Sequence, residues 1–157
     1  MPHDGGQEAV ATDAHKFLVE RKIPADFRWV RRAIHEIEDE LISHGITRQD
    51  VGSVSIILAE AFNNVVEHAY GESEEGEIEV TIRRRNQSII FEICDDGRPM
   101  PNGRPPAGSV PDADGDHLDS LPEGGFGWLL IRELVRDLIY DRRDDQNILI
   151  FRYRLED

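Results

Sequence analysis

Near the start of the chain, apolar residues recur at helical spacing directly after Pro24 and Asp26, two residue types typical of a helix start. The apolar positions of this pattern are Val30, Ile34, Ile37 and Leu41. The pattern stops at Gly45, a residue type that often follows the last turn of a helix. Upstream of it, the segment KFLVE from Lys16 is short and rich in strand-forming residues. We therefore expect a strand and then an amphipathic helix.

A second helical pattern starts at Thr47 and Asp50 and ends before Gly71, which opens the acidic turn GESEEGE. Its apolar side consists of Val54, Leu58, Ala61, Phe62, Val65 and Val66. The opposite side carries carboxylates, amides and one imidazole, at Glu60, Asn63, Asn64, Glu67 and His68. An ordinary solvated face mixes charges of both signs, whereas no lysine or arginine occurs between Arg48 and Arg83. This face is therefore either solvated or occupied by a cation.

Alternating apolar and polar residues then predict two strands, EIEVTIRRR and SIIFEICD. The connection through Arg85, Asn86 and Gln87 is typical of a hairpin, so the two strands should be adjacent and antiparallel. Closer to the C-terminus, the segment WLLIRELVRDL predicts a helix. The apolar side of this helix consists of Trp128, Ile131, Leu134, Val135 and Leu138. The segments LIYDR and NILIFRYRL predict two last strands around a DDQN turn.

Between these segments, Gly97 to Gly125 holds six prolines with several glycines and aspartates, which excludes regular structure from most of the stretch. A loop of this length inside a compact domain is uncommon and is usually functional or disordered. We expect residues 98–124 to form an acidic, mobile lid. The segment PDADGDHLDSLPE also resembles a calcium-binding loop, but His117 stands where that loop needs a glycine. Calcium is therefore disfavoured.

The predicted strands and helices are segregated along the chain rather than strictly alternating. This order favours an α+β fold, a two-layer sandwich in which a mostly antiparallel sheet carries its helices on one face. A chain of 157 residues is most simply one domain. Residues 1–13 are rich in glycine and alanine and have no periodicity, so we expect a disordered tail followed by a single domain over residues 14–157.

An apolar content of 39% with 32% charged residues is normal for a soluble protein, and no segment is apolar enough to cross a membrane. The single cysteine, Cys94, excludes an internal disulfide, and the N-terminal segment lacks the features of a secretory signal. A reducing cytoplasm fits best. The formal net charge of −14 disfavours direct binding to nucleic acid. The only lysines are Lys16 and Lys22, which excludes P-loop proteins and ordinary protein kinases.

Two polar segments beside the predicted elements can carry chemistry. Asp95 and Asp96 precede Gly97 at the end of a strand, where a carboxylate can accept a hydrogen bond from the exocyclic amine of a purine. The alternative is a simple DDG bend. The segment GGFG opens a helix, whose unpaired backbone N–H groups suit a phosphate chain, although a tight turn is an equal alternative. A dinucleotide fingerprint is disfavoured because Leu130 stands where its third glycine belongs.

In order and spacing, E-x-x-x-N with a following histidine, then DDG, a Pro/Gly-rich loop and GGFG before a helix resemble the GHKL ATP-binding superfamily. Among its members, residues 15–155 are most similar to the small anti-sigma-factor serine kinases of bacterial partner switching. The resemblance implies a Bergerat-type ATP-binding fold with ATP and Mg²⁺ as cofactors. Each part of the pattern is weak alone, and their combination is specific.

The resemblance also implies roles for individual residues. Glu60 matches the general base, and Asn64, one helical turn further on, matches the Mg²⁺ ligand. Asp95 matches the aspartate that receives the adenine amino group. For His68, orienting Asn64 or capping the helix end is an alternative to binding nucleotide. The remaining nucleotide-binding positions that the resemblance implies are Gly97, Arg104, Gly125, Phe126 and Gly127.

Three features depart from the family pattern. Pro99 stands where the second glycine of the D-x-G-x-G motif is expected, which stiffens the backbone there. Glu123 precedes the GGFG glycines where some family kinases carry an arginine, so turnover should be slow unless Arg104 substitutes from the first half of the lid. On the last strand pair, Gln146 and Asn147 replace the usual Gly-Thr, which puts a threonine contact near adenine in doubt.

Two hypotheses about function follow. The first is a serine kinase and anti-sigma factor, which phosphorylates a STAS-type anti-anti-sigma factor on serine and sequesters a sigma factor. The second is an ATP-binding stoichiometric switch with little or no kinase activity. The presence of Glu60 favours the first, and the absent lid arginine favours the second. A catalytic fragment of a histidine kinase is disfavoured because no helix pair with an acceptor histidine is present. The resemblance further implies a homodimer.

Overall fold

The computed structural model describes residues 16–70, 75–107 and 125–156, with the side chains of residues 125 and 126 excepted. In chain order the elements are β1 (Lys16–Pro24), α1 (Phe27–Ser43), α2 (Arg48–Asn64), the π-helical turn η1 (Val65–Ala69), β2 (Glu77–Arg85), β3 (Ser88–Asp95), the 3₁₀ turn η2 (Pro101–Gly103), α3 (Gly125–Leu134), β4 (Arg136–Arg143) and β5 (Gln146–Arg154). The tail at residues 1–13, the lid from residue 108 onward and the calcium-like segment lie outside the described residues.

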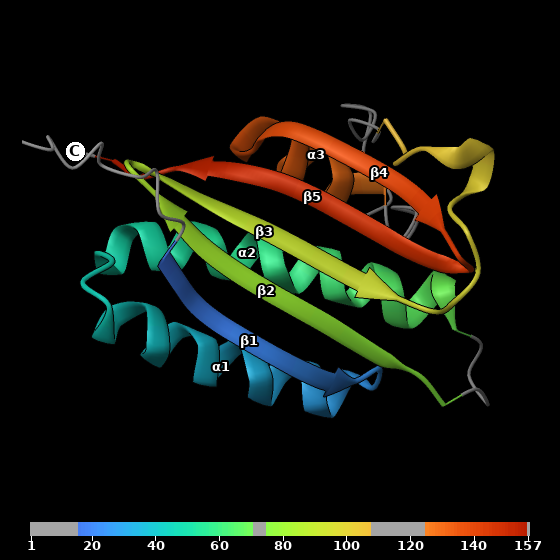
Figure 1. Ribbon diagram of the computed structural model, residues 1–157, viewed down its shortest axis with the longest axis horizontal. Helices are drawn as coiled ribbons and strands as arrows, with labels where there is room; N and C mark the ends of the chain where they lie inside the picture. The colour runs from blue at the N-terminus through green and yellow to red at the C-terminus, as the bar shows by residue number, and fades with distance from the viewer. Residues whose placement is uncertain (1–15, 71–74, 108–124, 157) are drawn as a thin grey trace, which may run out of the picture.

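The five strands form one sheet in the order β1-β2-β3-β5-β4, and every neighbouring pair is antiparallel. Figure 1 shows the sheet as one layer and the helices α1, α2 and α3 as a second layer behind it. The prediction of an α+β sandwich with helices on one face is therefore confirmed. In the part of the chain that the structure describes, no helix is both long and apolar enough to cross a membrane.

The core lies between the sheet and the helices because strand side chains alternate between the two faces. The inward positions of the three central strands are Ile78, Val80 and Ile82 on β2, Ile89, Phe91 and Ile93 on β3, and Leu149, Phe151 and Tyr153 on β5. The rings of Phe91 and Phe151 stack with centroids 4.9 Å apart. Cys94 is buried, and burial raises the pKa of its thiol to about 12, so it is inert at neutral pH.

Both long helices begin at a capping side chain. The Asp26 carboxylate accepts the Arg28 backbone N–H at 2.8 Å at the start of α1, and Gly45 adopts the left-handed conformation, with φ of 84°, just beyond its end. The Thr47 hydroxyl accepts the Asp50 N–H at 3.2 Å at the start of α2. The buried carboxylate of Asp50 in turn accepts the hydroxyl of Tyr153 at 2.9 Å. This contact ties the start of α2 to the end of β5.

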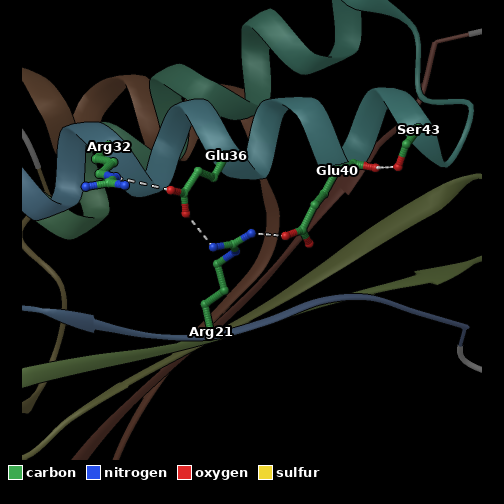
Figure 2. Close-up of polar contacts among 5 residues, drawn as sticks. All are labelled: Arg21, Arg32, Glu36, Glu40 and Ser43. Carbon is green, nitrogen blue, oxygen red and sulfur yellow. Dashed lines mark hydrogen bonds and ion pairs between the residues drawn. The ribbon is translucent and has the colours of Figure 1, made fainter.

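Helix α1 is joined to the outer strand β1 by one arginine. As Figure 2 shows, the guanidinium of Arg21 lies between the carboxylates of Glu36 and Glu40 on successive turns of α1. Arg32 reaches Glu36 at 3.3 Å from one turn earlier. The Arg21 side chain is only 29% exposed, so these ion pairs are partly shielded from water. They fix the helix over the edge of the sheet farthest from β4.

The pattern of the second helix predicts a regular α-helix up to Gly71, but the structure is not a regular α-helix at this end. From Val65 to Ala69 the chain forms a π-helical turn, closed by the Tyr70 N–H donating to the Val65 carbonyl at 3.3 Å. The Ala69 carbonyl accepts the N–H of Arg98 at 2.8 Å, so this turn bonds to the loop that follows β3. Tertiary contacts of this kind leave no trace in hydrophobic spacing. The wider turn brings His68 and Ala69 to the same cavity as Asn64.

The helix predicted from WLLIRELVRDL is shorter than its apolar pattern indicates. Helix α3 ends at Leu134, and β4 begins at Arg136, so Leu138 belongs to a strand and the predicted helix was wrong over its last turn. Asp137 adopts a left-handed φ of 56°, and the register of β4 on β5 breaks between Arg136 and Ile139. Pairing with β5 therefore extends β4 into the helical pattern, and Leu138 still packs against the core.

Candidate nucleotide-binding site

A cavity of about 500 Å³ lies where η1, the loop after β3, the start of β5 and α3 meet. This volume is in the range that accommodates small ligands and cofactors. Its lining residues are Asn64, Val65, His68, Ala69, Asp95, Arg98, Pro99, Met100, Pro101, Pro106, Trp128 and Asn147. The cavity thus collects three of the residues singled out in the sequence, namely Asn64, His68 and Asp95.

Asp95 is the last residue of β3 and is 6% exposed, whereas its neighbour Asp96 is exposed. Its Oδ1 accepts the Gly97 N–H at 2.9 Å and the amide Nδ2 of Asn147 at 2.8 Å. Burial raises the pKa of the Asp95 carboxyl, and the hydrogen bonds from Asn147 and Gly97 and the charge of Arg142 oppose that shift. The site therefore holds a desolvated carboxylate that protein donors keep in one orientation.

Gly97 allows the loop after β3 to lie directly on η1. A Cβ added at this position would stand 2.4 Å from the Ala69 carbonyl oxygen and 2.6 Å from the Ala69 Cβ. Both obstacles belong to the backbone or sit directly on it, so they cannot move aside independently of the turn. The adjacent hydrogen bond from Arg98 to Ala69 holds this contact. The glycine thus lets the loop with Arg98 and Pro99, which line the cavity, pack on η1.

The polar face of α2 reaches the cavity at Asn64, the last residue of the helix. Its Oδ1 accepts the indole N–H of Trp128 at 3.3 Å, and Trp128 is 2% exposed. A carbonyl oxygen has two lone pairs, so one remains for another partner. Glu60, one turn earlier, is half-buried, as is Asn63, whereas Glu67 and His68 are exposed. The contact with Trp128 orients Asn64 from α3.

Gly127 lies against Glu60. A Cβ added at Gly127 would stand 2.0 Å from Oε2 of Glu60 and 2.8 Å from its carboxyl carbon. No side chain larger than hydrogen fits there without displacing the carboxylate. The glycine-rich turn that opens α3 therefore leaves the Glu60 carboxylate its space, a relation that the sequence pattern had not indicated.

The oxygen donors at this site suit Mg²⁺ only when a nucleotide supplies further ligands. Among residues 16–70, 75–107 and 125–156, no three His, Cys, Asp or Glu side chains lie close enough to hold a metal ion by themselves. Mg²⁺ typically takes one or two oxygen ligands from a protein and completes its octahedron with phosphates and water. The free lone pair of Asn64 Oδ1 matches that requirement, so the residues present fit Mg²⁺ bound as a nucleotide complex.

The remaining residues predicted for the site are Arg104, Gly125 and Phe126. Arg104 is exposed and is absent from the cavity lining, whereas Arg98, which the sequence analysis did not single out, lines the cavity. Gly125 opens α3, and the side chain of Phe126 lies outside the described part of the chain. The arginine that lines the cavity is therefore Arg98, on the loop directly after β3.

Comparison with known families decides what kind of domain this is. The model of the histidine kinase-like ATPase domain matches residues 23–153, which covers most of the chain. The chain belongs to this family. Membership in an ATPase-domain family implies that the protein binds ATP.

The chain is also similar to individual proteins and to a solved structure. It is 26% identical over 139 residues to the serine-protein kinase RsbW of Oceanobacillus iheyensis, covering 88% of each chain. It is 30% identical over 100 residues to the serine/threonine-protein kinase BtrW of Bordetella bronchiseptica, covering 62% of this chain and 66% of the relative. Among solved structures, the catalytic domain of the histidine kinase ThkA superposes with a TM-score of 0.47 at 16% identity, over 89% of this chain and 97% of that one.

Within this ATPase domain, several positioning residues escaped the sequence analysis. Trp128 was assigned to the apolar side of a helix, and Tyr140 and Arg142 to an ordinary strand, yet each bonds to a residue of the cavity. Tyr70 accepts the Asp96 N–H at 2.9 Å and donates to the Glu77 carbonyl at 3.1 Å, which fixes the outer side of the same loop. The only sign of such a role in the sequence was that Tyr70, an aromatic residue with a hydroxyl group, stands directly before the turn GESEEGE.

We expect Gly127→Ala to lower catalytic turnover far more than ATP affinity. The added methyl group occupies the space of the Glu60 carboxylate, whose end can rotate away, so the fold survives while the carboxylate is displaced. The family resemblance implies that Glu60 is the general base, and displacement of a general base typically costs roughly 10²-fold in rate or more. Steady-state turnover and the ATP dissociation constant, measured side by side, check this. Gly52→Ala is the matched control, because nothing lies within 4 Å of a Cβ at that helical glycine. Equal losses in affinity and turnover for Gly127→Ala would contradict the assignment.

Proposed function

We propose that this protein is an ATP-dependent serine kinase and anti-sigma factor. It binds Mg·ATP in the cavity beside Asp95, phosphorylates a STAS-type anti-anti-sigma factor on serine, and sequesters a sigma factor in the alternate complex. The names of relatives such as RsbW of Oceanobacillus iheyensis, a serine-protein kinase, support the reaction class. The observation that carries the proposal is the convergence of Asn64, His68 and Asp95 on one cavity, with Glu60 one turn from Asn64.

Recognition of the base rests on Asp95. Its Oδ1 is bound by Gly97 and Asn147, and its side chain lines the cavity. The carboxylate therefore presents an acceptor to the exocyclic amine of adenine, in a buried position where hydrogen bonds to a charged group are strong. Pro99 and Met100 add apolar surface to the same wall, which suits a purine ring.

Transfer of the phosphoryl group rests on Glu60. Its carboxylate accepts the proton of the attacking serine hydroxyl, and Gly127 leaves it the space to do so. When bound, Mg²⁺ neutralises the phosphate charge that develops during transfer. Asn64 would hold the ion through its amide oxygen, and Trp128 keeps that amide oriented. The N-terminal end of α3, which begins at Gly125, carries the positive end of the helix dipole and would favour the phosphate chain.

One observation favours a second candidate, an ATP-dependent stoichiometric binder with little kinase activity. No lysine or arginine lies between Arg104 and Arg132. Arg132 itself donates to the carbonyls of Pro105 and Pro106, at 2.9 Å and 3.0 Å, so it is engaged in holding the loop. A lid cation near the γ-phosphate would stabilise charge during transfer, and its absence predicts slow turnover.

Incubation with γ-labelled ATP, Mg²⁺ and a purified STAS-type anti-anti-sigma factor separates the two candidates. The kinase predicts label on serine of the STAS-type protein that withstands acid treatment, whereas label on a phosphohistidine is lost in acid. The control is the same STAS-type protein with its candidate acceptor serine changed to alanine, which should stay unlabelled. ATP binding without any transfer would refute the kinase and leave the stoichiometric binder.

A further inference from the structure

Asn147 connects β4, β5 and the loop after β3. It is the second residue of β5, is 4% exposed, and lies opposite Asp95 on one side and Arg142 on the other in the sheet register. Its Nδ2 donates to Asp95 Oδ1 at 2.8 Å and to the Arg98 carbonyl at 2.8 Å, with the Gly97 carbonyl at 3.3 Å. Its Oδ1 accepts from the Tyr140 hydroxyl and, at 2.9 Å, from Arg142.

The chemistry of these partners fixes which way the amide points. The Arg142 guanidinium can only donate, so the oxygen of the Asn147 amide must face it. The nitrogen must then face Asp95, whose ionised carboxylate can only accept. Because the same nitrogen of Arg142, Nη1, also donates to the Gly97 carbonyl at 2.6 Å, the guanidinium cannot turn away from this arrangement without breaking another bond. A reversed amide would place two acceptors together and two donors together.

The amide therefore determines which oxygen of Asp95 is available to a ligand. Asp95 Oδ1 is occupied by Asn147 and Gly97, and within the described part of the chain no hydrogen bond to Oδ2 is found. Asp95 lines the cavity. An ionised carboxylate held in this way can accept a hydrogen bond but cannot donate one. It therefore distinguishes a purine with a 6-amino group, which donates, from one with a 6-oxo group, which accepts.

We propose that Asn147, anchored by Tyr140 and Arg142, is a positioning residue that makes the cavity select a 6-aminopurine over a 6-oxopurine by holding Asp95 as an acceptor. The inference rests on the proposed function, because it assumes that Asp95 meets the base of a nucleotide. The bonds from Asn147 to the Gly97 and Arg98 carbonyls give it a second effect, since they hold the loop that forms the wall of the cavity.

The electrostatic surroundings of Asp95 support this role. Burial raises the pKa of Asp95, and the hydrogen bond from Asn147 is the largest of the opposing effects. Gly97 and the charge of Arg142 also lower that pKa, and Asp96 raises it. Loss of the amide removes this opposing effect and raises the pKa of Asp95 further, which favours the protonated form, a donor that suits a 6-oxo group. Two further ionisable side chains line the cavity, His68 and Arg98.

The test compares ATP with inosine triphosphate, which differs by a 6-oxo group, in Mg²⁺ titrations of the full-length protein by calorimetry. The wild type should prefer ATP. Asn147→Leu, of similar size, should weaken ATP binding roughly tenfold and reduce the ATP preference by a similar factor. Asn147→Thr keeps one donor toward Asp95 and should retain the preference. The control is Gln146→Leu, on the neighbouring position of the same strand, which should leave both constants unchanged.

Asn147→Asp provides a second loss variant, nearly isosteric with the wild type, should Asn147→Leu fail to fold. Two facing carboxylates retain a shared proton, so its ATP preference should fall and should fall further as the pH is lowered. A wild-type protein without affinity for ATP overturns the proposed function and this inference together. A wild type that prefers ATP, with the same preference in Asn147→Leu or Asn147→Asp, overturns this inference alone.

Discussion

Glu60→Gln is expected to lower the rate of phosphoryl transfer to serine by roughly 10²- to 10⁴-fold, while the affinity for ATP stays nearly unchanged. Glutamine has the shape of glutamate but cannot accept the proton of the attacking hydroxyl. Its amide fits the space that Gly127 leaves, so the helix packing of α2 against α3 is retained. Single-turnover transfer from γ-labelled ATP and calorimetric titration of ATP measure the two quantities separately.

Glu67→Gln is the matched control for this experiment. It makes the same chemical change on an exposed residue that follows Glu60 by about two turns and does not line the cavity. We expect its transfer rate and its ATP affinity to equal those of the wild type. Full transfer activity in Glu60→Gln, with activity lost in Glu67→Gln, would show that Glu60 is not the general base.

Asp95→Asn is expected to lower ATP affinity about 100-fold, corresponding to roughly 2–3 kcal/mol, without unfolding the protein. The asparagine oxygen can still accept the N–H of Gly97 and the amide of Asn147. The asparagine nitrogen, however, then faces the cavity and meets the adenine amine donor to donor. The same change should improve the affinity for inosine triphosphate, so the two nucleotides together separate a changed specificity from a collapsed site.

The stability of Asp95→Asn follows from the direction of the pKa shift. Burial raises the pKa of Asp95 above the ordinary value that it has in the unfolded chain, so the native state binds the proton more tightly than the unfolded state does. Ionisation therefore costs stability as the pH rises through the interval between the two pKa values, and the wild type carries this cost at neutral pH. The asparagine side chain does not ionise and therefore does not carry this cost. Thermal unfolding should show Asp95→Asn at least as stable as the wild type at pH 7, with the difference vanishing in acid below the unfolded pKa. A marked loss of stability at pH 7 would contradict this.

The fold could be predicted where periodicity was unambiguous. The alternation in EIEVTIRRR and SIIFEICD matched β2 and β3, because one face of this strand pair carries the buried side chains Ile78, Val80 and Ile82 on β2 and Ile89, Phe91 and Ile93 on β3. Leu138 was misassigned because it fits the spacing of the preceding helix and also the strand that pairs with β5. The hydrophobic spacing did not indicate the π-helical turn at Val65, whose last residue, Ala69, accepts a hydrogen bond from Arg98 of a distant loop.

The candidate site was predictable only in part. The positions of Asn64 and Asp95 followed from motif spacing within single elements. The contacts of Asn147 with Asp95 and with Arg142 depend on the order of β3, β5 and β4 in the sheet, which spacing along the chain does not contain. At Asn147 the sequence indicated only that the usual threonine is replaced. The structure places there a side chain with two donors and an acceptor, and all of them are used.

Calorimetric titration of ATP into the purified protein, with and without Mg²⁺, tests most directly whether the cavity beside Asp95 and Asn64 is a nucleotide site. Asn64 offers one oxygen to the ion, and the described residues contain no cluster able to hold a metal alone. We therefore predict that ATP binds tightly only when Mg²⁺ is present and that Mg²⁺ without nucleotide produces no binding heat. The absence of magnesium-dependent affinity for ATP would contradict the account.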